Sequence, residues 1–568
     1  MEEKRDEFQV GRMTSIVLDL TIVILLLAVG LGVRYAYASK VVFPPLDDPA
    51  FYLTTAENVV KGRGLEIDAL WSYQIPFSKV THPSHEHWMP LTTGAMAAAF
   101  ALLDTSLRSG QLPGLLTGAL LAPLTYLFGR RALRKGRQPT RGLLGGNRGT
   151  ALGAALLIAI NATLGYQSAS ADSSALFALL AAWTLTIAVR RPGDEGSYLG
   201  VGLLIALAYL ARADGLLLLV AVPLAWWLLP PPPRRPVEPP DSPTAQLVWE
   251  HWPRERGVEE KEQRSLGPGM SSLLDLIVPF AIVVAPWLVR NYLAFGTPLP
   301  TSILSQAWLT DYVDTFNYWN QPTWQTWLAQ GWQAILVQRG QALLHNGSVF
   351  LLSTFPWGLL ALPGLWLLRR RWSFFPQLVY GLLLFFATAL VFPVSSTAGT
   401  FYHSMGAVMP FLALAAAYAV QQGVHWIIKN GEKATRIYWA VSAGLLVLAA
   451  AQVIITLPAV AERHQAEKAQ FEAVTEWLTR NAHPGDVVMT TQPYTLNYAS
   501  GRPCIVLPGN EPPDSAWDAA QRYGARFLVI TQTFGQYPEI LHQQPDPRFR
   551  LLEATETTEI YEIGRGQP

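Results

Sequence analysis

The 568-residue chain has little cysteine and little charge. Its one cysteine, Cys504, leaves no partner for an intramolecular disulfide and excludes a cysteine-based zinc or iron–sulfur site. Charged residues make up 15% of the sequence, whereas soluble proteins have about a quarter, so a typical cytosolic enzyme is excluded. A formal net charge of +1 without a basic domain excludes the counterion-release binding of nucleic-acid-binding proteins. Because half of the residues are hydrophobic, the composition indicates a polytopic membrane protein.

Apolar segments long enough to cross a bilayer recur over residues 1–457. A bilayer core takes about 20 apolar residues of helix. Nine segments meet this test, at residues 14–36, 111–129, 150–168, 173–190, 272–292, 346–368, 373–393, 404–424 and 437–457, and residues 198–230 hold two shorter helices broken at 211–215. We therefore predict about eleven transmembrane helices.

Positive charge predicts the orientation, since Lys and Arg near short loops stay on the cytoplasmic side. Segment 130–148 carries seven basic residues and no acid. With this segment inside, the connections on its side hold 21 basic residues and the opposite connections hold two. A short apolar stretch, 88–103, either crosses the membrane, which would make 37–87 cytoplasmic, or lies in the outer interface. We favour the second placement, with a cytoplasmic N-terminus and an external loop at 37–110.

Two further parts of the chain differ from the helical bundle. The Pro-rich stretch 231–269 predicts a disordered cytoplasmic linker, because proline cannot continue a helix. Residues 458–568 form a predicted extracytoplasmic α/β domain. Its helices are expected at 464–480 and 514–523, its strands at 486–489, 502–507 and 526–530, and a hairpin around 553–558. The short loops and the lack of disulfides fit the plasma membrane of a prokaryote.

Unusual polar residues gather at the predicted outer ends of the helices. They are Asp47, Asp48, Asp172, Arg212, Asp214, Arg290 and His403. Ionisable residues in mid-membrane, typical of ion-coupled transporters, are nearly absent. This pattern favours a reaction at the outer interface over passage across the membrane.

The pair Asp47-Asp48 lies among apolar and aromatic residues. Mutual repulsion and burial should raise the pKa of at least one carboxyl group, which suits a general base. Alternatively, Asp47 caps a helix whose first turn is Asp48-Pro49-Ala50, since Asp is favoured at the cap and Pro early in a helix.

Four motifs over residues 14–425 resemble the GT-C superfamily of polyprenyl-phosphate-sugar glycosyltransferases. They are Asp47-Asp48 with Tyr52 and Gly62-Arg63-Gly64; His82-Pro83 with Met89-Pro90-Leu91; Arg212-Ala213-Asp214-Gly215; and Pro286-Trp287 through Arg290-Asn291 to Thr297-Pro298. The similar branch includes protein mannosyltransferases and the lipid A aminoarabinose transferase. Asp48 departs from the Glu of many members, and the His82–His87 element is longer and richer in histidine.

The resemblance implies an inverting transfer in which Asp47 activates the acceptor and polyprenyl phosphate leaves. Asp48 and Asp172 would support Asp47, with Tyr52 and Asp214 in the same pocket. A phosphate leaving group needs charge stabilisation more than a proton, so Arg212 and Arg290, with His403, are expected to hold it. As alternatives, each arginine snorkels to the interface, His403 is a satisfied interfacial histidine, and Asp172 is an ordinary helix cap.

His82, His85, Glu86 and His87 offer two interpretations. Such a tract can bind a divalent metal, Mg, Mn or Zn, or its side chains can hydrogen-bond the lipid phosphate or one another. The branch that the sequence resembles is metal-independent, so no cofactor is assigned. The external stretch 293–345 carries five tryptophans, which stack on sugars or, more commonly, form an interfacial belt.

We therefore expect an integral-membrane glycosyltransferase that moves a sugar from a polyprenyl-phosphate donor to a lipid, glycan or protein acceptor of the envelope. A lipid or glycan transporter is the first alternative, although the inverted repeat common in transporters is not seen in the sequence. A non-catalytic membrane scaffold is the second. In such a scaffold, the polar residues of the outer ends would not share a cavity.

Overall fold

The computed structural model describes residues 2–133, 146–189, 198–228, 270–299, 305–369, 371–531, 541–543 and 545–564. The predicted linker 231–269, the central part of the basic segment 130–148, and the pair Arg190 and Arg191 lie outside the described residues. The predictions about these segments therefore stay predictions.

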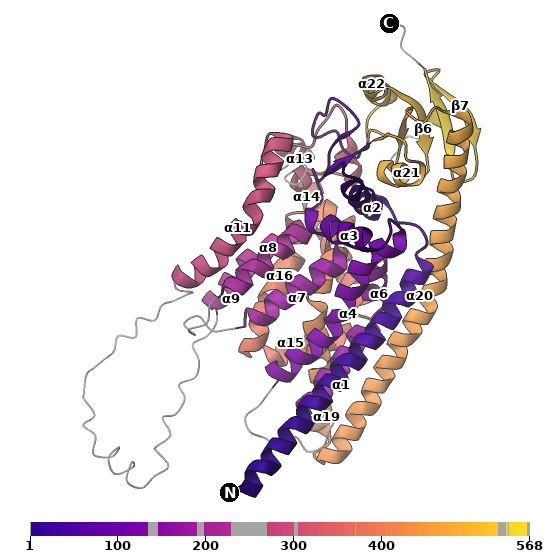
Figure 1. Cartoon of the computed structure of the whole chain (residues 1–568). Helices are drawn as coiled ribbons and strands as arrows, with labels where there is room; N and C mark the ends of the chain where they lie inside the picture. The colour runs from indigo at the N-terminus through magenta and orange to yellow at the C-terminus, as the bar shows by residue number, and fades with distance from the viewer. Residues whose placement is uncertain are drawn as a thin grey trace, which may run out of the picture.

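Helices dominate the first 480 residues (Figure 1). They are α1 (Glu2–Lys40), α2 (Asp47–Val60), α3 (Pro90–Leu102), α4 (Leu107–Ala132), α5 (Gly146–Ala159), α6 (Ala162–Ala169), α7 (Ser174–Ile187), α8 (Leu199–Ala211), α9 (Leu216–Leu228), α11 (Met270–Phe295), α13 (Trp324–Ala329), α14 (Trp332–Ser353), α15 (Gly358–Leu368), α16 (Phe375–Leu390), α17 (Pro393–Thr397), α18 (Thr400–Ser404), α19 (Met409–Ile427) and α20 (Gly431–Asn481). Each of the eleven apolar segments predicted from the sequence is mainly helical over its described residues.

Length divides these helices into three groups. Within the described residues, the helical stretches Met13–Lys40, Leu107–Ala132, Met270–Phe295 and Gly431–Asn481 are each long and apolar enough to cross a membrane. Three bent pairs, α5 with α6, α14 with α15, and Thr400–Ala407 with α19, pass the same test together, with bends of 49°, 100° and 63°. Five shorter apolar helices remain: α3, α7, α8, Ala213–Leu228 and α16. The protein is thus a multi-span helical protein in which several spans are bent or short.

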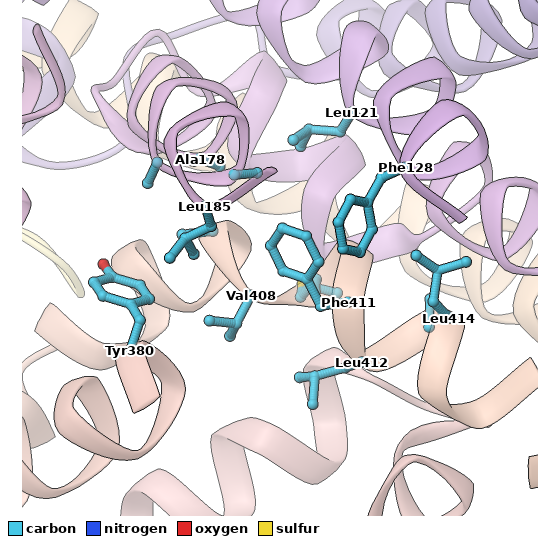
Figure 2. Close-up of a cluster of buried hydrophobic side chains, with 14 of the residues drawn as sticks. Leu121, Phe128, Ala178, Leu185, Tyr380, Val408, Phe411, Leu412 and Leu414 are labelled. Atoms are coloured by element: carbon cyan, nitrogen blue, oxygen red, sulfur yellow. The ribbon is translucent and has the colours of Figure 1, made fainter. Parts of the chain in front are cut away.

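Helix α19 lies at the centre of the bundle. Residues 409–418 are buried without interruption, as expected for a helix that is apolar on all sides. Figure 2 shows its side chains facing those of the first half of the chain. There the Phe411 ring meets the Phe128 ring of α4 edge to face, with 5.1 Å between the ring centroids. This core holds the N-terminal and C-terminal halves of the bundle together.

Helix α3 corresponds to the ambiguous stretch 88–103. It has 13 residues, which gives about 20 Å of rise, against a hydrocarbon core of about 30 Å. It packs against α2, α4 and α8. Helix α8 also has 13 residues, so this length does not decide between the two placements, and the interfacial placement stays a prediction.

A mixed six-stranded sheet forms the C-terminal region. Its strand order is β2-β5-β4-β6-β8-β7. Five strands match the predicted elements: β4 (Val487–Thr490), β5 (Cys504–Val506), β6 (Ala525–Ile530), β7 (Phe549–Ala554) and β8 (Glu559–Ile563). Helix α22 (Pro513–Tyr523) was also expected, whereas α21 (Pro493–Ser500) was not. The predicted helix at 464–480 is the end of α20, which continues unbroken from the bundle.

The sixth strand comes from the first loop of the bundle. Strand β2 (Ala69–Leu70) pairs in parallel with β5, with Ala69 opposite Cys504. Aromatic rings extend this contact: Phe51 of α2 stacks on Trp88 at 4.5 Å, and Tyr494 of α21 meets both rings edge to face. Consequently residues 43–100 and the C-terminal region share one buried hydrophobic cluster.

The N-terminal end of α1 and the C-terminal sheet lie at opposite ends of the molecule (Figure 1). Helices α2 and α3 lie at the end of the bundle that faces the sheet. Helix α20 has 51 residues, or about 77 Å of length. It runs beside α1 and reaches from the bundle to the sheet, so it joins the membrane region to the C-terminal region as one rod.

Candidate active site

Asp47 is the first residue of α2, and its side chain does not cap that helix. The N-cap is Leu46, which makes no side-chain cap hydrogen bond, so the capping interpretation of Asp47 is wrong. Instead the carboxylate crosses to the C-terminal region. Its Oδ1 accepts hydrogen bonds from the backbone N–H and the hydroxyl of Thr495, at 2.9 and 3.0 Å.

Burial raises the pKa of the Asp47 carboxyl from its ordinary 3.8 to about 7. The hydrogen bonds from Thr495 favour the ionised form and act against this shift, while the negative charge of Asp48 adds to it. The sequence-based expectation of a perturbed carboxyl is therefore met at Asp47. A carboxyl group that titrates near neutral pH is suited to accept a proton from a hydroxyl group.

Asp48 and Asp47 act on partly different groups. The charge of Asp48 acts on Tyr52, His87 and Arg212. Both acids act on Tyr494 of the C-terminal region, and Asp47 also acts on Cys504 of the sheet. The C-terminal region is thus a neighbour of both acids, and Asp48 also interacts with the cluster around Arg212.

Arg212 lies at the break between α8 and the short 3₁₀ helix Ala213–Gly215. Its Nε donates to Asp214 at 3.1 Å and its Nη1 to Ser173 at 3.0 Å. The hydroxyl of Tyr52 is also hydrogen-bonded to Ser173, which connects α2 to this site. Gly215 is required for the break, because a Cβ there would lie 2.4 Å from the backbone nitrogen of Tyr209. Arg212 is therefore held inside the protein and does not snorkel.

Asp172 both caps a helix and contacts His403. Its Oδ1 accepts a hydrogen bond from the backbone N–H of Ser174 at 2.7 Å, which satisfies the start of α7. Its Oδ2 lies 3.5 Å from Nδ1 of His403, and the same imidazole nitrogen lies 2.8 Å from the Ser174 hydroxyl. Burial would raise the pKa of Asp172, but the contacts with His403, Ser174 and Arg212 hold it below its usual range.

The polar cluster around Arg212 extends to the second half of the bundle. Ser404 of α18 donates a hydrogen bond to Asp214, and His403 of the same helix reaches Asp172. The structure therefore brings together six of the predicted site residues from α2, the start of α7, the break after α8 and α18. They are Asp48, Tyr52, Asp172, Arg212, Asp214 and His403.

Arg290 lies in another environment. Its guanidinium group is 5.0 Å from the ring centroids of both Trp287 and Phe295, and it donates weakly to the carbonyl of Leu65 at 3.3 Å. Its charge acts on His85 and Glu86. Arg212 and Arg290 thus have different partners, and Arg290 borders the histidine-rich loop.

The histidine-rich loop is buried, and its side chains diverge. Both ring nitrogens of His85 are hydrogen-bonded, to Ser84 and Thr93, and burial, with the charge of Arg290, lowers its pKa to about 3. The His87 ring packs against the Trp71 and Trp88 rings, with 4.9 Å between the ring centroids in each pair. Among the described residues, no three His, Cys, Asp or Glu side chains converge as metal ligands do. The loop does not fit the metal site considered from the sequence.

Glu86 of this loop is a second acid bound by the C-terminal region. The Tyr494 hydroxyl donates to its Oε1 at 2.9 Å, and Nε2 of His82 lies 3.8 Å from the same oxygen. Burial would raise the pKa of Glu86, but His82 and Tyr494 hold it below the usual range. The carboxylate is therefore ionised inside the protein.

A strained backbone conformation occurs directly before three of the acids. Within the described residues, the non-glycine positions with positive φ are Leu46, His85 and Ala171, at 62°, 71° and 58°. They directly precede Asp47, Glu86 and Asp172. Such conformations cost on the order of 1–3 kcal/mol and gather at functional sites. The strain therefore points independently to these three carboxylates.

The tryptophan-rich stretch of 293–345 is attached to the C-terminal region. Glu511 accepts hydrogen bonds from the backbone N–H groups of Tyr318, Trp319 and Asn320, at 2.7, 2.9 and 2.7 Å. Trp324 and Trp332 are more than half exposed. This exposure agrees with an interfacial belt and with a sugar-binding surface, so both interpretations stay open.

Several residues of this site were not identified from the sequence. Tyr494 and Thr495 lie on α21, the helix that was not expected. The local signal for this helix is Pro493 at its first position and Gly501, with φ 67°, directly after its end, an arrangement typical of helix starts and stops. Ser173, Ser174 and Ser404 have no sequence signal of their own.

Three solved structures with a similar architecture are distant in sequence. ArnT from Cupriavidus metallidurans bound to undecaprenyl phosphate matches with a TM-score of 0.56 at 12% identity, over 95% of this chain and 97% of that one. The chain therefore has an ArnT-like fold. The apo state of the same ArnT matches with a TM-score of 0.53 at 12% identity, over 95% of this chain and 97% of that one. The apo oligosaccharyltransferase of Archaeoglobus fulgidus matches with a TM-score of 0.48 at 13% identity, over 90% of this chain and 69% of that one.

Comparisons at the sequence level found no relatives. No protein-family model matches the chain, and no curated protein matches it. The structural similarity to ArnT nevertheless covers nearly the full length of both chains. It agrees with the resemblance that the four motifs show in the sequence.

Proposed function

We infer that the protein is an integral-membrane inverting glycosyltransferase that uses a polyprenyl-phosphate-linked sugar. The observation that carries this proposal is the pair Asp47-Asp48 beside the Arg212 cluster, at one end of an ArnT-like fold. The structure of ArnT from Cupriavidus metallidurans contains undecaprenyl phosphate, which supports a lipid donor of the same class. Sugar and acceptor are left at the level of a hexose or pentose and a lipid, glycan or protein of the envelope.

In the proposed reaction, Asp47 removes the proton from an acceptor hydroxyl group. The hydroxyl oxygen then forms a bond to the anomeric carbon of the sugar, and the bond from that carbon to the phosphate oxygen breaks on the opposite side. The polyprenyl phosphate leaves with the electron pair, so the configuration inverts. The raised pKa of Asp47 supports its role as the base.

The phosphate group needs positive charge near the leaving oxygen. Arg212 is the first candidate for binding the phosphate, because it lies within the polar cluster and interacts electrostatically with Asp48. His403 and Arg290 border the same end of the bundle and would complete the phosphate site. Asp48, Asp172 and Asp214 keep the cluster ordered before the donor binds, since each interacts with Arg212.

The contacts of the two acids support a division between donor and acceptor. Asp48 acts on Arg212, the proposed partner of the donor phosphate, whereas Asp47 accepts hydrogen bonds from Thr495 of the C-terminal region. In this proposal the acceptor enters from the side of that region. The positive-inside pattern supports a position of this region outside the cell, with the N-terminus in the cytoplasm.

The decisive experiment uses the purified full-length protein in lipid nanodiscs. Radiolabelled undecaprenyl-phosphate-linked mannose, glucose and arabinose are offered in turn with an envelope extract, and labelled product and released undecaprenyl phosphate are measured. We expect one donor to react, and Asp47→Asn to lower the rate by at least about 10²-fold, the usual contribution of general-base catalysis. Glu556→Gln, on the exposed tip between β7 and β8, is the control.

Two outcomes would count against this proposal. A correctly folded Asp47→Asn protein with the wild-type rate would remove Asp47 from the role of base. Movement of the lipid-linked sugar across the membrane without release of undecaprenyl phosphate would favour the transporter instead.

A further inference from the structure

We propose that the first turn of α21 in the C-terminal region is a positioning element of the catalytic centre, in which Thr495 holds Asp47 and Tyr494 holds Glu86. This inference rests on the proposed function for its catalytic consequence. The contacts themselves are independent of that function. They connect residues more than 400 positions apart in the sequence.

Thr495 is the direct partner of Asp47. Its backbone N–H and its hydroxyl both donate to Oδ1, and the backbone N–H of Tyr494 also hydrogen-bonds the carboxyl group. These donors stand in the first turn of a helix, where backbone N–H groups have no partner inside the helix. The carboxylate therefore acts as an external cap for α21, and the helix in return sets its orientation.

Among the described residues, none of the largest influences on the pKa of Asp47 is a cation. The titratable groups that face it are Asp48 on its own helix, Tyr494 on α21, Tyr312 on the short helix Tyr312–Phe316, and Cys504 on β5. All four are acids. The hydrogen bonds from α21 are therefore the main interactions that stabilise the ionised form of Asp47 against burial.

Tyr494 holds the second acid in the same way. Its hydroxyl donates to Glu86, and its ring packs against Phe51 and Trp88. Phe51 lies one turn after Asp47 on α2, so the ring contacts fix the helix that carries the base. Adjacent residues of one helical turn thus bind two acids, Asp47 and Glu86, that follow the strained residues Leu46 and His85.

The surrounding structure makes α21 a rigid support. Asn497 closes the loop after the helix by donating to the carbonyl of Arg502 at 2.7 Å. Strand β5 follows at once and pairs with β2 of the first loop. Tyr73 of that loop donates to the carbonyl of Val506. Helix α21 is therefore fixed both to the sheet of the C-terminal region and to the first loop of the bundle. A catalytically competent Asp47 thus requires that the C-terminal region is docked on this loop.

The test removes one hydrogen-bond donor to Asp47 and keeps the shape of the Thr495 side chain. Thr495→Val deletes the hydroxyl and keeps the backbone N–H. Because this hydroxyl favours the ionised carboxylate, its loss should raise the titration midpoint of Asp47 by about one pH unit. The midpoint is read in the full-length protein by difference infrared spectroscopy of the protonated carboxyl band, assigned by its disappearance in Asp47→Asn. Thr495→Ser should restore the wild-type midpoint.

A second readout is the pH profile of the transfer reaction. In Thr495→Val the acidic limb of kcat/KM should move to higher pH by the same amount, and Thr495→Ser should return it. Thr479→Val, which removes an exposed hydroxyl on α20, is the matched control and should leave both readouts unchanged. Thr495→Ala replaces Thr495→Val if the valine variant does not fold.

Tyr494→Phe tests the other contact. It removes the hydroxyl from Glu86 but keeps the ring between Phe51 and Trp88, so the fold should persist while kcat falls. Tyr498→Phe on the same helix is its control. An unchanged kcat in folded Tyr494→Phe protein would remove Tyr494 from the positioning element.

The two proposals fail in different ways. A wild-type midpoint for Asp47 in folded Thr495→Val protein would overturn the positioning role, whatever the activity. If no donor reacts with the wild-type protein, the proposed function fails, while the infrared midpoint still decides whether Thr495 controls Asp47.

Discussion

At the scale of single residues, Asp47 is held in a site that disfavours its charge. Burial raises its pKa from 3.8 to about 7, so the folded protein binds this proton more tightly than the unfolded chain does. The contribution of the group to stability is therefore full below pH 4 and is lost as the pH rises through 7. A functional carboxylate is here maintained at the expense of stability at neutral pH.

This linkage predicts a pH-dependent gain of stability in Asp47→Asn. The amide carries no charge and its oxygen can still accept from Thr495, so the variant avoids the cost of a buried carboxylate. Its apparent melting temperature should equal that of the wild type near pH 4 and exceed it above pH 7. Scanning fluorimetry of both proteins between pH 4 and 8 checks this. If the wild-type protein had a higher melting temperature than Asp47→Asn at pH 8, this linkage would be contradicted.

Leu46 predicts a second residue-scale effect. Its φ of 62° and ψ of −175° lie in a region that is essentially restricted to glycine, and its side chain is 46% exposed. Leu46→Gly should therefore raise the free energy of unfolding by about 1 kcal/mol, because the strain relieved exceeds the burial lost. Urea titration in detergent measures the change.

The matched control for Leu46→Gly is Leu103→Gly. Leu103 also flanks a helix, directly after the end of α3, and is 63% exposed, but its φ is −127°. Glycine should therefore destabilise the protein at this position. The same sign of change in both variants would show that backbone strain at Leu46 is not the cause.

At the scale of elements, most helices could be predicted from hydropathy, because a span must be apolar over about 20 residues whatever its partners are. The bends at 161 and 355 were not apparent, since burial inside the bundle permits short and broken helices. Five of the C-terminal strands were expected from their apolar runs. Strand β2 was not, because two residues carry no periodic pattern and their partner lies more than 430 positions away.

The same limit applies to the candidate site. The acids and arginines could be identified from the sequence, because charged residues are rare beside apolar helices. Their partners could not, since Thr495, Tyr494 and Ser173 are common residue types whose role depends on where the chain brings them. The capping interpretation of Asp47 failed for this reason: the local sequence fits a cap, but a helix from the other end of the chain takes the side chain.

At the scale of the whole molecule, the first loop and the C-terminal region form one body at one end of the bundle. They share a sheet, a hydrophobic cluster and the hydrogen bonds at Asp47 and Glu86. Helix α20 connects this body to the other end of the molecule. The side of the membrane on which the body lies therefore determines where the proposed reaction occurs.

This arrangement predicts opposite accessibility for the two ends of α20. The helix is about 77 Å long, more than twice a bilayer core of about 30 Å, and its apolar first half is long enough to cross the membrane once. Lys429, just before α20, belongs to a connection with three basic residues and should lie in the cytoplasm. Glu556, between β7 and β8, should lie outside.

Single cysteines at these two exposed positions test the orientation. The background is Cys504→Ala, because the native cysteine is buried and its removal leaves no other thiol in the chain. A membrane-impermeant maleimide should label Glu556→Cys in intact cells, and should label Lys429→Cys only after the membrane is permeabilised. Labelling of Lys429→Cys alone in intact cells would reverse the orientation and place Asp47 on the cytoplasmic side. Labelling of both would show that α20 does not cross the membrane as a single span.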